Sequence, residues 1–433
     1  MQKQYLFFYT NSMSLLFLSY FFLFSTTSTC LGSSSFTKIL SRIKMPKSKT
    51  NQCYYSKSFT ASSGNGYSPN GFLLSAKNKR RAKLSMVTTS IGAVAGMQYA
   101  SNHTHAEDNN VRKPKDTIGY PWEKNEATQF MQYVKVNTAS YKPNKKAPPI
   151  GGIFAHDDHL YTGAGNYKLF SQVQASKVII LGVTHGKAYE ETGKRLDTIT
   201  LDDYKAWEGP FGPVQIFPLR EKIREEMDEQ YVLTSSEAHA KEHSIESAVP
   251  FLQYFNKNVS IVPILVSPAN FETMQTMSDQ LAKIIVDYIQ TNNLVLGKDI
   301  FLLTSCDASH YGEDFHNTFL GSGKQGHRNA VAADRSACSH LSGIITEKDI
   351  ARFQQEEVVR RGWCGRHAVP FGTLVTLKVA KKLALSLEGE LIEYTDSLSG
   401  GALPPVGEGQ LGTTAPFNTC HWVGYAFMLF YTC

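Results

Sequence analysis

Four short runs of apolar residues, each bounded by turn-forming residues, set the pattern of the chain after residue 106. They span residues 150–155, 178–184, 259–266 and 300–305. Runs of this length predict buried strands, although hydrophobic periodicity alone also allows a short buried helix.

Segments with helical spacing alternate with these runs. They span residues 127–136, 244–257, 271–291 and 374–385. In the second of them, apolar side chains recur at i, i+3, i+4 and i+7 from Ile245, and Pro250 would kink the helix unless it begins near Ser247. The alternation predicts an α/β fold: a single sandwich domain with a mostly parallel central sheet and helices on both faces.

Ionisable side chains directly follow three of the four runs. His156 follows the first and His185 the second, while Asp307 and His310 follow the fourth. Ligands of open α/β sheets bind outside the carboxyl ends of the strands. We therefore expect one shared polar crevice at that edge of the sheet.

The two histidines at the strand ends are candidate metal ligands. Two imidazoles and a third donor, with positions left open for water or substrate, make a transition-metal site of the catalytic type. Taken singly, each histidine is equally compatible with a hydrogen-bonded polar residue. A zinc hydrolase is excluded at the level of motifs, because no His-Glu-x-x-His segment is present.

Asp307 and His310 are candidates for proton transfer. On a helical turn, residues three apart share a face, and an imidazole titrates near neutral pH. The alternative is a helix cap at Asp307 with a surface histidine at 310.

Cys364 lies in a second polar cluster with Arg366 and His367. Neighbouring cationic groups favour the thiolate, which is the form of cysteine that ligates metals. The alternative is an inert, buried cysteine in a turn.

Two further ionisable segments are candidates for outer contacts to metal or substrate. The first, Asp157-Asp158-His159, could equally be a solvated loop. The second, Glu242-His243, leads into a predicted helix N-terminus, which favours anions.

Charge divides the chain into two parts. Residues 1–106 hold 12 of the 44 Lys and Arg residues and no acid, so the other 32 bases face all 38 acids. The basic character belongs to the N-terminal leader. The bases are scattered and no nucleic-acid-binding module accompanies them, so we expect no nucleic-acid partner.

The leader has the composition of targeting sequences. Residues 1–30 contain a ten-residue apolar core, shorter than the roughly 20 residues that span a bilayer, and predict a signal peptide. If residues 6–9 join that core, a signal anchor is the alternative. We expect no permanent membrane span in the mature protein.

Residues 31–106 resemble transit peptides in being acid-free and rich in Ser and Lys, and Arg80-Arg81 precede a mildly apolar segment as in twin-arginine signals. A staged route through secretory entry, plastid import and transfer to the thylakoid lumen is one interpretation. A secreted protein with a low-complexity leader is the other.

Seven cysteines are too few for a disulfide-built fold. Five of them follow residue 106, and an odd number leaves at least one unpaired unless a second chain contributes a partner.

Several motifs, taken in order, resemble the Memo-like family. They are Ala155-His156 with Tyr161-Thr162-Gly163, and the segments at 180–185, 207–212, 242–251, 305–312, 364–367 and 423–426. The resemblance covers about 150–430, so we assign 107–433 to a Memo-like domain. This family is similar in fold to the LigB-like class III extradiol dioxygenases, which hold non-haem iron between two histidines and a carboxylate.

The resemblance implies a ligand set and a catalytic pair. His156 and His185 would take the two histidine positions, Cys364 would replace the carboxylate, and His310 would be the catalytic histidine beside Asp307. A thiolate is a soft donor, so copper or iron would be the cofactor, with zinc as a further candidate. Ring cleavage does not follow from the fold alone.

The chain departs from the family pattern at two places. Asp157 and Asp158 follow His156 where the family has small and aromatic residues, and Cys306 stands where the family usually has Ser. These changes add acidic groups and a second thiol close to the predicted metal.

The function that we expect is metal-dependent oxidation or reduction of a small oxidisable molecule. The alternative from another class is a non-catalytic scaffold whose crevice binds a peptide or phosphopeptide. A third is metal carriage without turnover.

Overall fold

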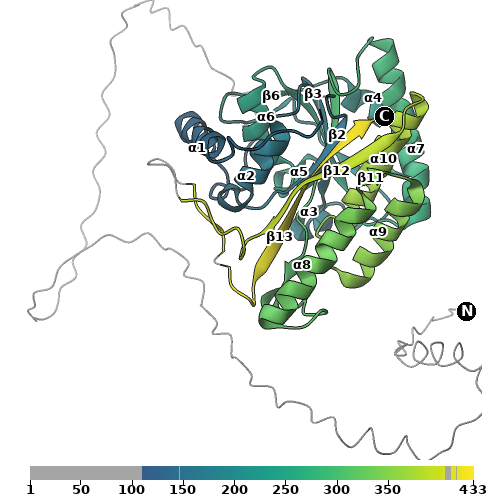
Figure 1. The fold of residues 1–433 in the computed structure, drawn as a ribbon. Coiled ribbons are helices and arrows are strands. Elements are labelled where there is room, and N and C mark those ends of the chain that lie inside the picture. Colours follow the sequence, from purple (N-terminus) through teal and green to yellow (C-terminus); the bar gives the residue numbers. More distant parts are fainter. Residues whose placement is uncertain (1–109, 146, 405–410, 416) are drawn as a thin grey trace, which may run out of the picture. The chain divides into compact units, whose positions relative to one another are not determined.

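The computed structural model describes residues 110–145, 147–404, 411–415 and 417–433 (Figure 1). The predicted signal peptide (1–30), the targeting leader (31–106) and the predicted domain start at 107 lie outside the described residues. Within those residues, no helix is both long enough and apolar enough to cross a bilayer.

A 13-stranded sheet forms the centre of the molecule. Its main path runs β1-β5-β6-β8-β3-β9-β2-β13-β12-β11. Strands β6, β8, β3, β9 and β2 are parallel to one another, whereas β13, β12 and β11 add antiparallel pairs at one side. The strands of this path are β1 (Val111–Arg112), β2 (Gly151–Phe154), β3 (Lys177–Val183), β5 (Ala206–Trp207), β6 (Val214–Ile216), β8 (Ser260–Val266), β9 (Ile300–Ser305), β11 (Gly343–Ile344), β12 (Leu387–Asp396) and β13 (Trp422–Thr432).

Three short strands lie off this path. β4 (Ile199–Leu201) pairs with β8 and β7 (Val232–Thr234), and β10 (His310–Tyr311) pairs with β13.

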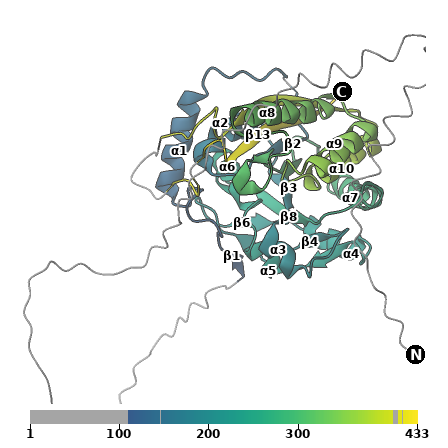
Figure 2. The ribbon, with the colours of Figure 1, turned by 90° about the horizontal axis from the view of Figure 1, so that it is seen from below.

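Helices cover both faces of the sheet (Figures 1 and 2). They are α1 (Lys124–Asn137), α2 (His159–Phe170), α3 (Gly186–Glu191), α4 (Leu219–Glu226), α5 (Ser236–Ala240), α6 (Val249–Phe255), α7 (Phe271–Thr291), α8 (Gly323–His340), α9 (Glu347–Arg360) and α10 (Ala368–Lys382), with short 3-10 turns at Glu246–Ala248 and Glu313–Phe315. The predicted α/β sandwich with a mostly parallel sheet is confirmed.

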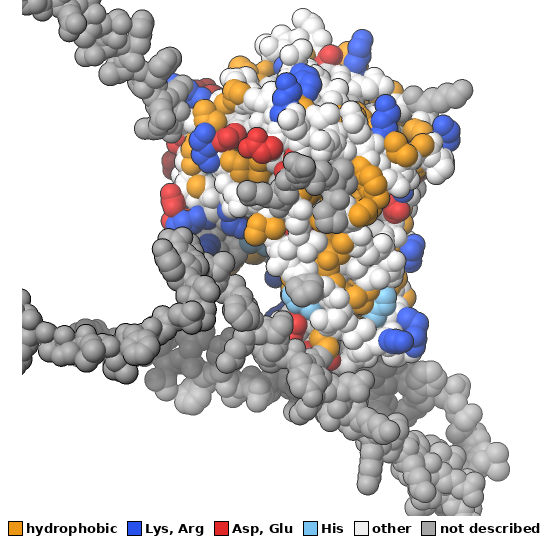
Figure 3. Space-filling model, turned by 90° about the vertical axis from the view of Figure 1, so that its left-hand side faces the viewer, with side chains coloured by type: hydrophobic (Ala, Val, Ile, Leu, Met, Phe, Trp, Pro, Cys, Tyr) orange, Lys and Arg blue, Asp and Glu red, His pale blue; other side chains and the backbone are white. Residues whose placement is uncertain are grey.

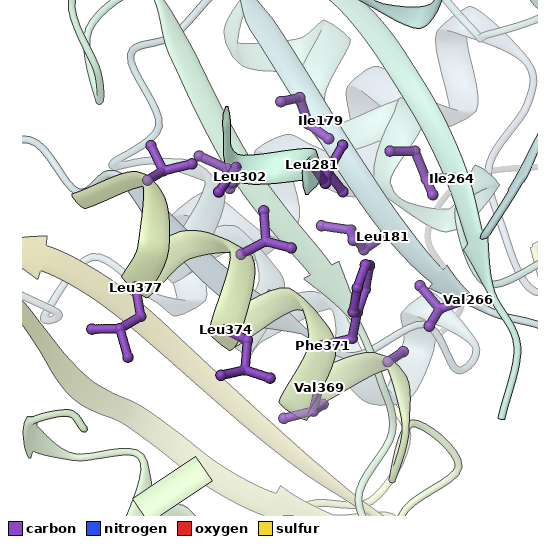
Figure 4. Close-up of a cluster of buried hydrophobic side chains, with 14 of the residues drawn as sticks. Ile179, Leu181, Ile264, Val266, Leu281, Leu302, Val369, Phe371, Leu374 and Leu377 are labelled. Atoms are coloured by element: carbon purple, nitrogen blue, oxygen red, sulfur yellow. The ribbon is translucent and has the colours of Figure 1, made fainter. Parts of the chain in front are cut away.

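Side chains of β3 alternate between two hydrophobic cores. Ile179 and Leu181 face the core that contains α7 and α10 side chains, while Val178 and Ile180 face the core of α1, α2 and α6. Figure 4 shows the first of these cores, where Phe371 and Leu374 of α10 lie near side chains of the strands. This alternation is the pattern of a strand buried on both faces.

The predicted elements agree closely with the observed ones. β2, β3, β8 and β9 correspond to the four apolar runs, and α7 has the predicted bounds. α6 begins at Val249, which leaves Pro250 in the first turn, and α10 begins at Ala368 rather than at 374.

The face of the molecule in Figure 3 carries both signs of charge. Lys and Arg side chains are interspersed with Asp, Glu and apolar side chains rather than gathered in one patch.

Candidate metal centre

Three neighbouring parallel strands bring the predicted site together. β9 lies between β3 and β2 in the sheet and is parallel to both. Their carboxyl ends therefore open at one edge, where His156 follows β2, His185 follows β3 and Asp307 follows β9.

His156 is held by a chain of hydrogen bonds that fixes its tautomer. Its Nδ1 lies 2.8 Å from the hydroxyl oxygen of Ser305, and that hydroxyl donates its own proton to the carbonyl oxygen of Ser244. Ser305 must then accept from His156 Nδ1–H, which leaves Nε2 for the crevice. A ligating histidine commonly ties back its other nitrogen in this way.

His185 is oriented by a buried carboxylate. Glu242 accepts from His185 Nδ1 at 2.8 Å and from the His185 backbone N–H at 2.7 Å. The backbone N–H groups of His243 and Ser244 also donate to Glu242. The anion predicted near this helix start is thus the Glu242 carboxylate of the protein itself. Because Glu242 binds Nδ1 of His185, the Nε2 atom of His185 is free to face the crevice.

Cys364 lies in the turn before α10 and contacts both histidines. Its Sγ is 3.7 Å from His156 Nε2, and it forms a side-chain hydrogen bond with His185. Burial raises the pKa of the Cys364 thiol, but hydrogen bonding from Cys306 and the nearby His156 outweigh it, so the pKa lies well below its usual range. These contacts favour the thiolate form of the sulfur.

The negative sulfur raises the pKa values of the histidines around it. Burial lowers the pKa of His156, but Asp307 and Cys364 outweigh this effect and the net shift is upward. Burial is likewise outweighed at His185, where Glu242 and Cys364 raise the pKa well above its usual range. A metal cation held by these side chains would compete with protons for the histidines and would balance the same anions.

Within the described ranges, two overlapping sets of three side chains bring potential ligand atoms within 4.8 Å of one another. One set is His156, His185 and His243, and the other is His156, Asp307 and Cys364. His156 belongs to both. The predicted set of His156, His185 and Cys364 is not itself one of these two sets, because His185 and Cys364 belong to different ones.

His243 is less suited to ligation than its position implies. Its ring stacks on that of His185, with centroids 5.0 Å apart, and burial lowers its pKa well below the usual value. Lys115 Nζ lies 3.1 Å from His243 Nδ1 and can only donate. In the neutral ring the proton then lies on Nε2, which removes that lone pair.

Asp307 and His310 do come together, but not on a helical turn. Residues 306–308 have no regular structure and His310 begins β10, so the proposed helical face and the alternative helix cap are both wrong. Asp307 lies 3.4 Å from His156 Nε2 and 3.8 Å from His310 Nε2. Extended backbone brings the two side chains together because β10 turns back to pair with β13.

His310 is the protonated member of this pair. Burial lowers its pKa, but Asp307 and Cys364 outweigh burial and raise it to about 10. Its Nε2 has no hydrogen-bond partner among the described residues. This N–H faces the Asp307 carboxylate only at 3.8 Å, too far for a hydrogen bond, so it can donate to a bound molecule.

The crevice opens into a pocket of about 300 Å³. Its walls include His185, His310 and Cys364 together with two arginines, Arg361 and Arg366. The predicted outer residue Arg366 therefore lines the pocket. The positive charge favours an anionic molecule.

Asp157 and Asp158 are not part of a solvated loop. Asp157 accepts from the Tyr425 hydroxyl at 2.6 Å, and burial followed by Asp307 raises its pKa to about 6. Asp158 accepts from the backbone and hydroxyl of Thr414, and burial followed by Asp157 raises its pKa to about 7.

Two predicted outer residues make contacts of other kinds. His159 is fully buried among the rings of Tyr120, Phe130 and Phe251 and bonds the Ser247 carbonyl, so it packs the core instead of facing the metal crevice. His367 borders the pocket, but its Nδ1 contacts the backbone of residue 269.

A segment before the first helix closes one side of the site, and no sequence pattern predicted this. Arg112 pairs with buried Glu246 and donates to the carbonyls of His239 and Glu242. The hydroxyl of Tyr120 donates to the carbonyl of His156. The available signal in the sequence is an arginine, Arg112, in a short polar stretch before the first predicted helix.

Fold and crevice together define an α/β sandwich protein with a candidate transition-metal centre at the carboxyl edge of its sheet. Residues 117–403 match the family model for Memo-like proteins. The match covers more than half of the chain, and the chain therefore belongs to the Memo-like family.

Curated relatives agree with this assignment. A MEMO1 family protein of Aquifex aeolicus is 28% identical over 195 residues, which are 44% of this chain and 64% of the relative. A MEMO1 family protein of Pyrococcus furiosus is 29% identical over 270 residues, 58% of this chain and 78% of the relative. One from Methanococcus vannielii is 25% identical over 301 residues, 65% and 90% of the two chains.

Proposed function

We propose that this protein binds one transition-metal ion, copper or iron, between His156, His185 and Cys364. With that ion it would oxidise or reduce a small molecule bound in the adjoining pocket. The observation that carries the proposal is the pair of imidazoles whose Nδ1 atoms are tied back to Ser305 and Glu242. Both Nε2 atoms are thereby left beside one thiolate.

The donor set fits a thiophilic metal. Two neutral imidazoles and a thiolate form the trigonal set found in copper sites, and they also bind iron or zinc. His310 Nε2 makes no hydrogen bond to a described residue and lies 3.8 Å from the Asp307 carboxylate, which supports a bound molecule as its acceptor. A copper or iron ion would supply one-electron redox chemistry there.

The other residues of the crevice bind, orient and hold protons. His310, protonated at neutral pH, can donate from Nε2 to an oxygen of the bound molecule. Asp307 accepts the backbone N–H of His156 at 2.8 Å and lies near both imidazoles, which fixes their positions.

The pocket favours an anion with an apolar part. Arg361 and Arg366 line the 300 Å³ pocket. A second pocket of about 510 Å³ shares Pro268 and His367 with it and is lined by Leu196, Phe271, Val358 and Val359 among others. The acidic group would lie near the arginines, and the apolar part would extend toward the second pocket.

Metal analysis of variants tests the ligand set. The purified full chain is loaded with Cu(I) or Fe(II), dialysed and assayed for bound metal. We expect about one equivalent in the wild type and in His243→Ala. His156→Ala, His185→Ala and Cys364→Ser should each lose more affinity than the roughly 10–100-fold typical of a residue that only orients a ligand.

Matched controls are available away from the crevice. His340→Ala and Cys433→Ser remove a histidine of α8 and an exposed thiol, and both should retain the metal. Retention of metal by His156→Ala and Cys364→Ser would rule out the proposed set. Loss of metal from His243→Ala alone would transfer the site to the three-histidine set.

A non-catalytic scaffold is the second candidate, favoured by the apolar second pocket. Under this alternative, metal-free wild type would bind a phosphopeptide as tightly as metal-loaded protein. Metal-dependent oxygen consumption with a reductant or a catechol would favour the enzyme, and stoichiometric metal without turnover would favour carriage.

A further inference from the structure

Two free thiols from distant parts of the chain meet beneath the crevice. The Sγ atoms of Cys306 and Cys364 lie 4.0 Å apart, although the residues are 58 positions apart in sequence. Cys306 follows β9 and Cys364 lies in the turn before α10. A disulfide needs the sulfurs about 2 Å apart, so bond formation requires the side chains and the turn to move closer together.

The backbone is shaped to bring these sulfurs together. The N–H of Asp307 donates to Cys364 Sγ and the N–H of Gly365 donates to Cys306 Sγ, both at 3.2 Å. A Cβ atom at residue 365 would lie 2.5 Å from Cys306 Sγ, so only glycine allows the turn to approach so closely. Each sulfur thus accepts a hydrogen bond from the backbone N–H of the residue that follows the other cysteine.

The two thiols differ in access. Cys364 lines the 300 Å³ pocket, whereas Cys306 has no exposed surface. A small oxidant that enters the pocket therefore meets Cys364 first. Cys306 can react only with a group already formed on Cys364.

We propose that Cys364 and Cys306 form a redox-active dithiol that is oxidised to a disulfide by hydroperoxides. The Cys364 thiolate attacks the peroxide O–O bond and gains one oxygen as a sulfenic acid. The leaving hydroxide or alkoxide takes a proton from solvent and departs as water or an alcohol. The Cys306 sulfur then attacks the Cys364 sulfur and forms the S–S bond, and the hydroxyl leaves as water with the thiol proton. Two thiols lose two electrons and the peroxide gains them.

Disulfide formation would compete with metal binding. This step alone rests on the proposed function, because a sulfur bonded to Cys306 is no longer a thiolate ligand. Hydroperoxide would therefore lower the metal affinity of the reduced chain. Bound metal would in turn slow the oxidation of Cys364.

The test maps disulfides in the full chain, reduced, stripped of metal with a chelator and treated with hydrogen peroxide. Digestion without reductant and mass spectrometry should show a peptide pair joined through Cys306 and Cys364. Differential alkylation should show the loss of the Cys306 and Cys364 thiols, counted apart from Cys420, which is disulfide-bonded in the structure, with recovery after dithiothreitol. Cys433→Ser, which lacks only an exposed thiol, should form the same disulfide.

Variants of the buried thiol separate this chemistry from misfolding. Cys306→Ser and Cys306→Ala should give no such disulfide and should instead accumulate a Cys364 sulfenic acid that dimedone traps. Trapping by dimedone requires an intact pocket, so a trapped Cys364 sulfenic acid also indicates that the variant has folded. The inference is overturned if Cys306 stays reduced while Cys364 in the wild type is oxidised, or if Cys364 does not react at all.

The result is independent of the metal assay. A Cys306–Cys364 disulfide in a chain that binds no metal would support the dithiol proposal and contradict the proposed metal function. Metal bound by His156, His185 and Cys364 without any Cys306–Cys364 disulfide would do the reverse.

Discussion

The buried histidine His159 shows how one residue type serves two purposes in this chain. It lies three positions after His156, yet its ring is enclosed by aromatic side chains and bonds one carbonyl. The sequence cannot separate the two residues, because both follow the same strand. Their difference arises from α2, which begins at His159 and turns its side chain into the core.

His159 should make stability depend on pH. Burial lowers its pKa to about 3, so between that value and its ordinary 6.5 the folded chain binds fewer protons than the unfolded chain. The contribution is present above pH 6.5 and is lost as pH falls toward 3. Below pH 6.5 the wild-type unfolding free energy should fall more steeply than that of His159→Gln, by up to about 1.4 kcal/mol per pH unit.

Denaturant unfolding of both proteins at several pH values measures this difference. Parallel curves for the wild type and His159→Gln would show that the ring is protonated without cost in the folded state.

The buried pair of Arg112 and Glu246 gives a second prediction at this scale. Arg112 is 2% exposed and Glu246 is fully buried, and the arginine also lies over the Trp207 ring at 4.2 Å. Arg112→Met would leave a buried carboxylate without its partner. We expect a loss of about 3–5 kcal/mol of unfolding free energy.

The adjacent residue supplies the control. Lys113 pairs with Glu208 at the surface, so Lys113→Met should cost less than about 1 kcal/mol. Adding Glu246→Gln to Arg112→Met should recover part of the loss, because no lone charge remains. Equal effects of the two single changes in urea unfolding would contradict the account.

At the scale of elements, the packing of α2 against β13 depends on a missing side chain. A Cβ atom at Gly165 would lie 2.1 Å from an atom of the Phe427 ring. Gly165→Ala should cost about 1–3 kcal/mol from overpacking, reduced by roughly 1 kcal/mol of improved helix propensity. Gly186→Ala, where the added atom meets nothing within 4 Å, is the matched control.

Thermal unfolding of the two glycine variants checks this prediction. A melting temperature for Gly165→Ala that equals that of Gly186→Ala would mean that α2 moves away from β13 without cost.

The sequence predicted the parallel centre of the sheet better than its sides. β2, β3, β8 and β9 are continuous apolar runs because both of their faces are buried. β1 and β5 have two residues each, too few for any periodicity. The long antiparallel pair of β12 and β13 was not predicted, because the pairing of these strands is set by the tertiary fold. Through β13 this pair lies next to β2 and borders the second core.

The candidate site was predictable in part for the same reason. His156, His185 and Asp307 follow strands, so the topology of a parallel sheet brings them together. Cys364 lies in a turn. Its cationic neighbours marked it as a reactive thiol, but only the family resemblance joined it to His156 and His185 in one ligand set. Ser305 and the carbonyl of Ser244 fix the tautomer of His156, and such contacts depend on a register that no local pattern encodes.

At the scale of the whole molecule, the leader and the folded domain carry different charge. We propose that the leader is removed and that the mature protein begins near Glu107. N-terminal sequencing of protein isolated from its native source tests this. A start near Leu31 would discard the staged route to the thylakoid lumen, and a start near Glu107 would support it.

The effect of proteolysis depends on two residues, Arg112 and Lys115, that lie just before the family match at 117–403. Both residues precede the match, yet Arg112 neutralises Glu246 and Lys115 contacts His243. A protease that cuts before residue 110 would leave these contacts intact. A protease that cuts between 112 and 117 would yield a fragment that still has every residue of the family match. In that fragment the Glu246 carboxylate would lack its Arg112 partner at the side of the crevice.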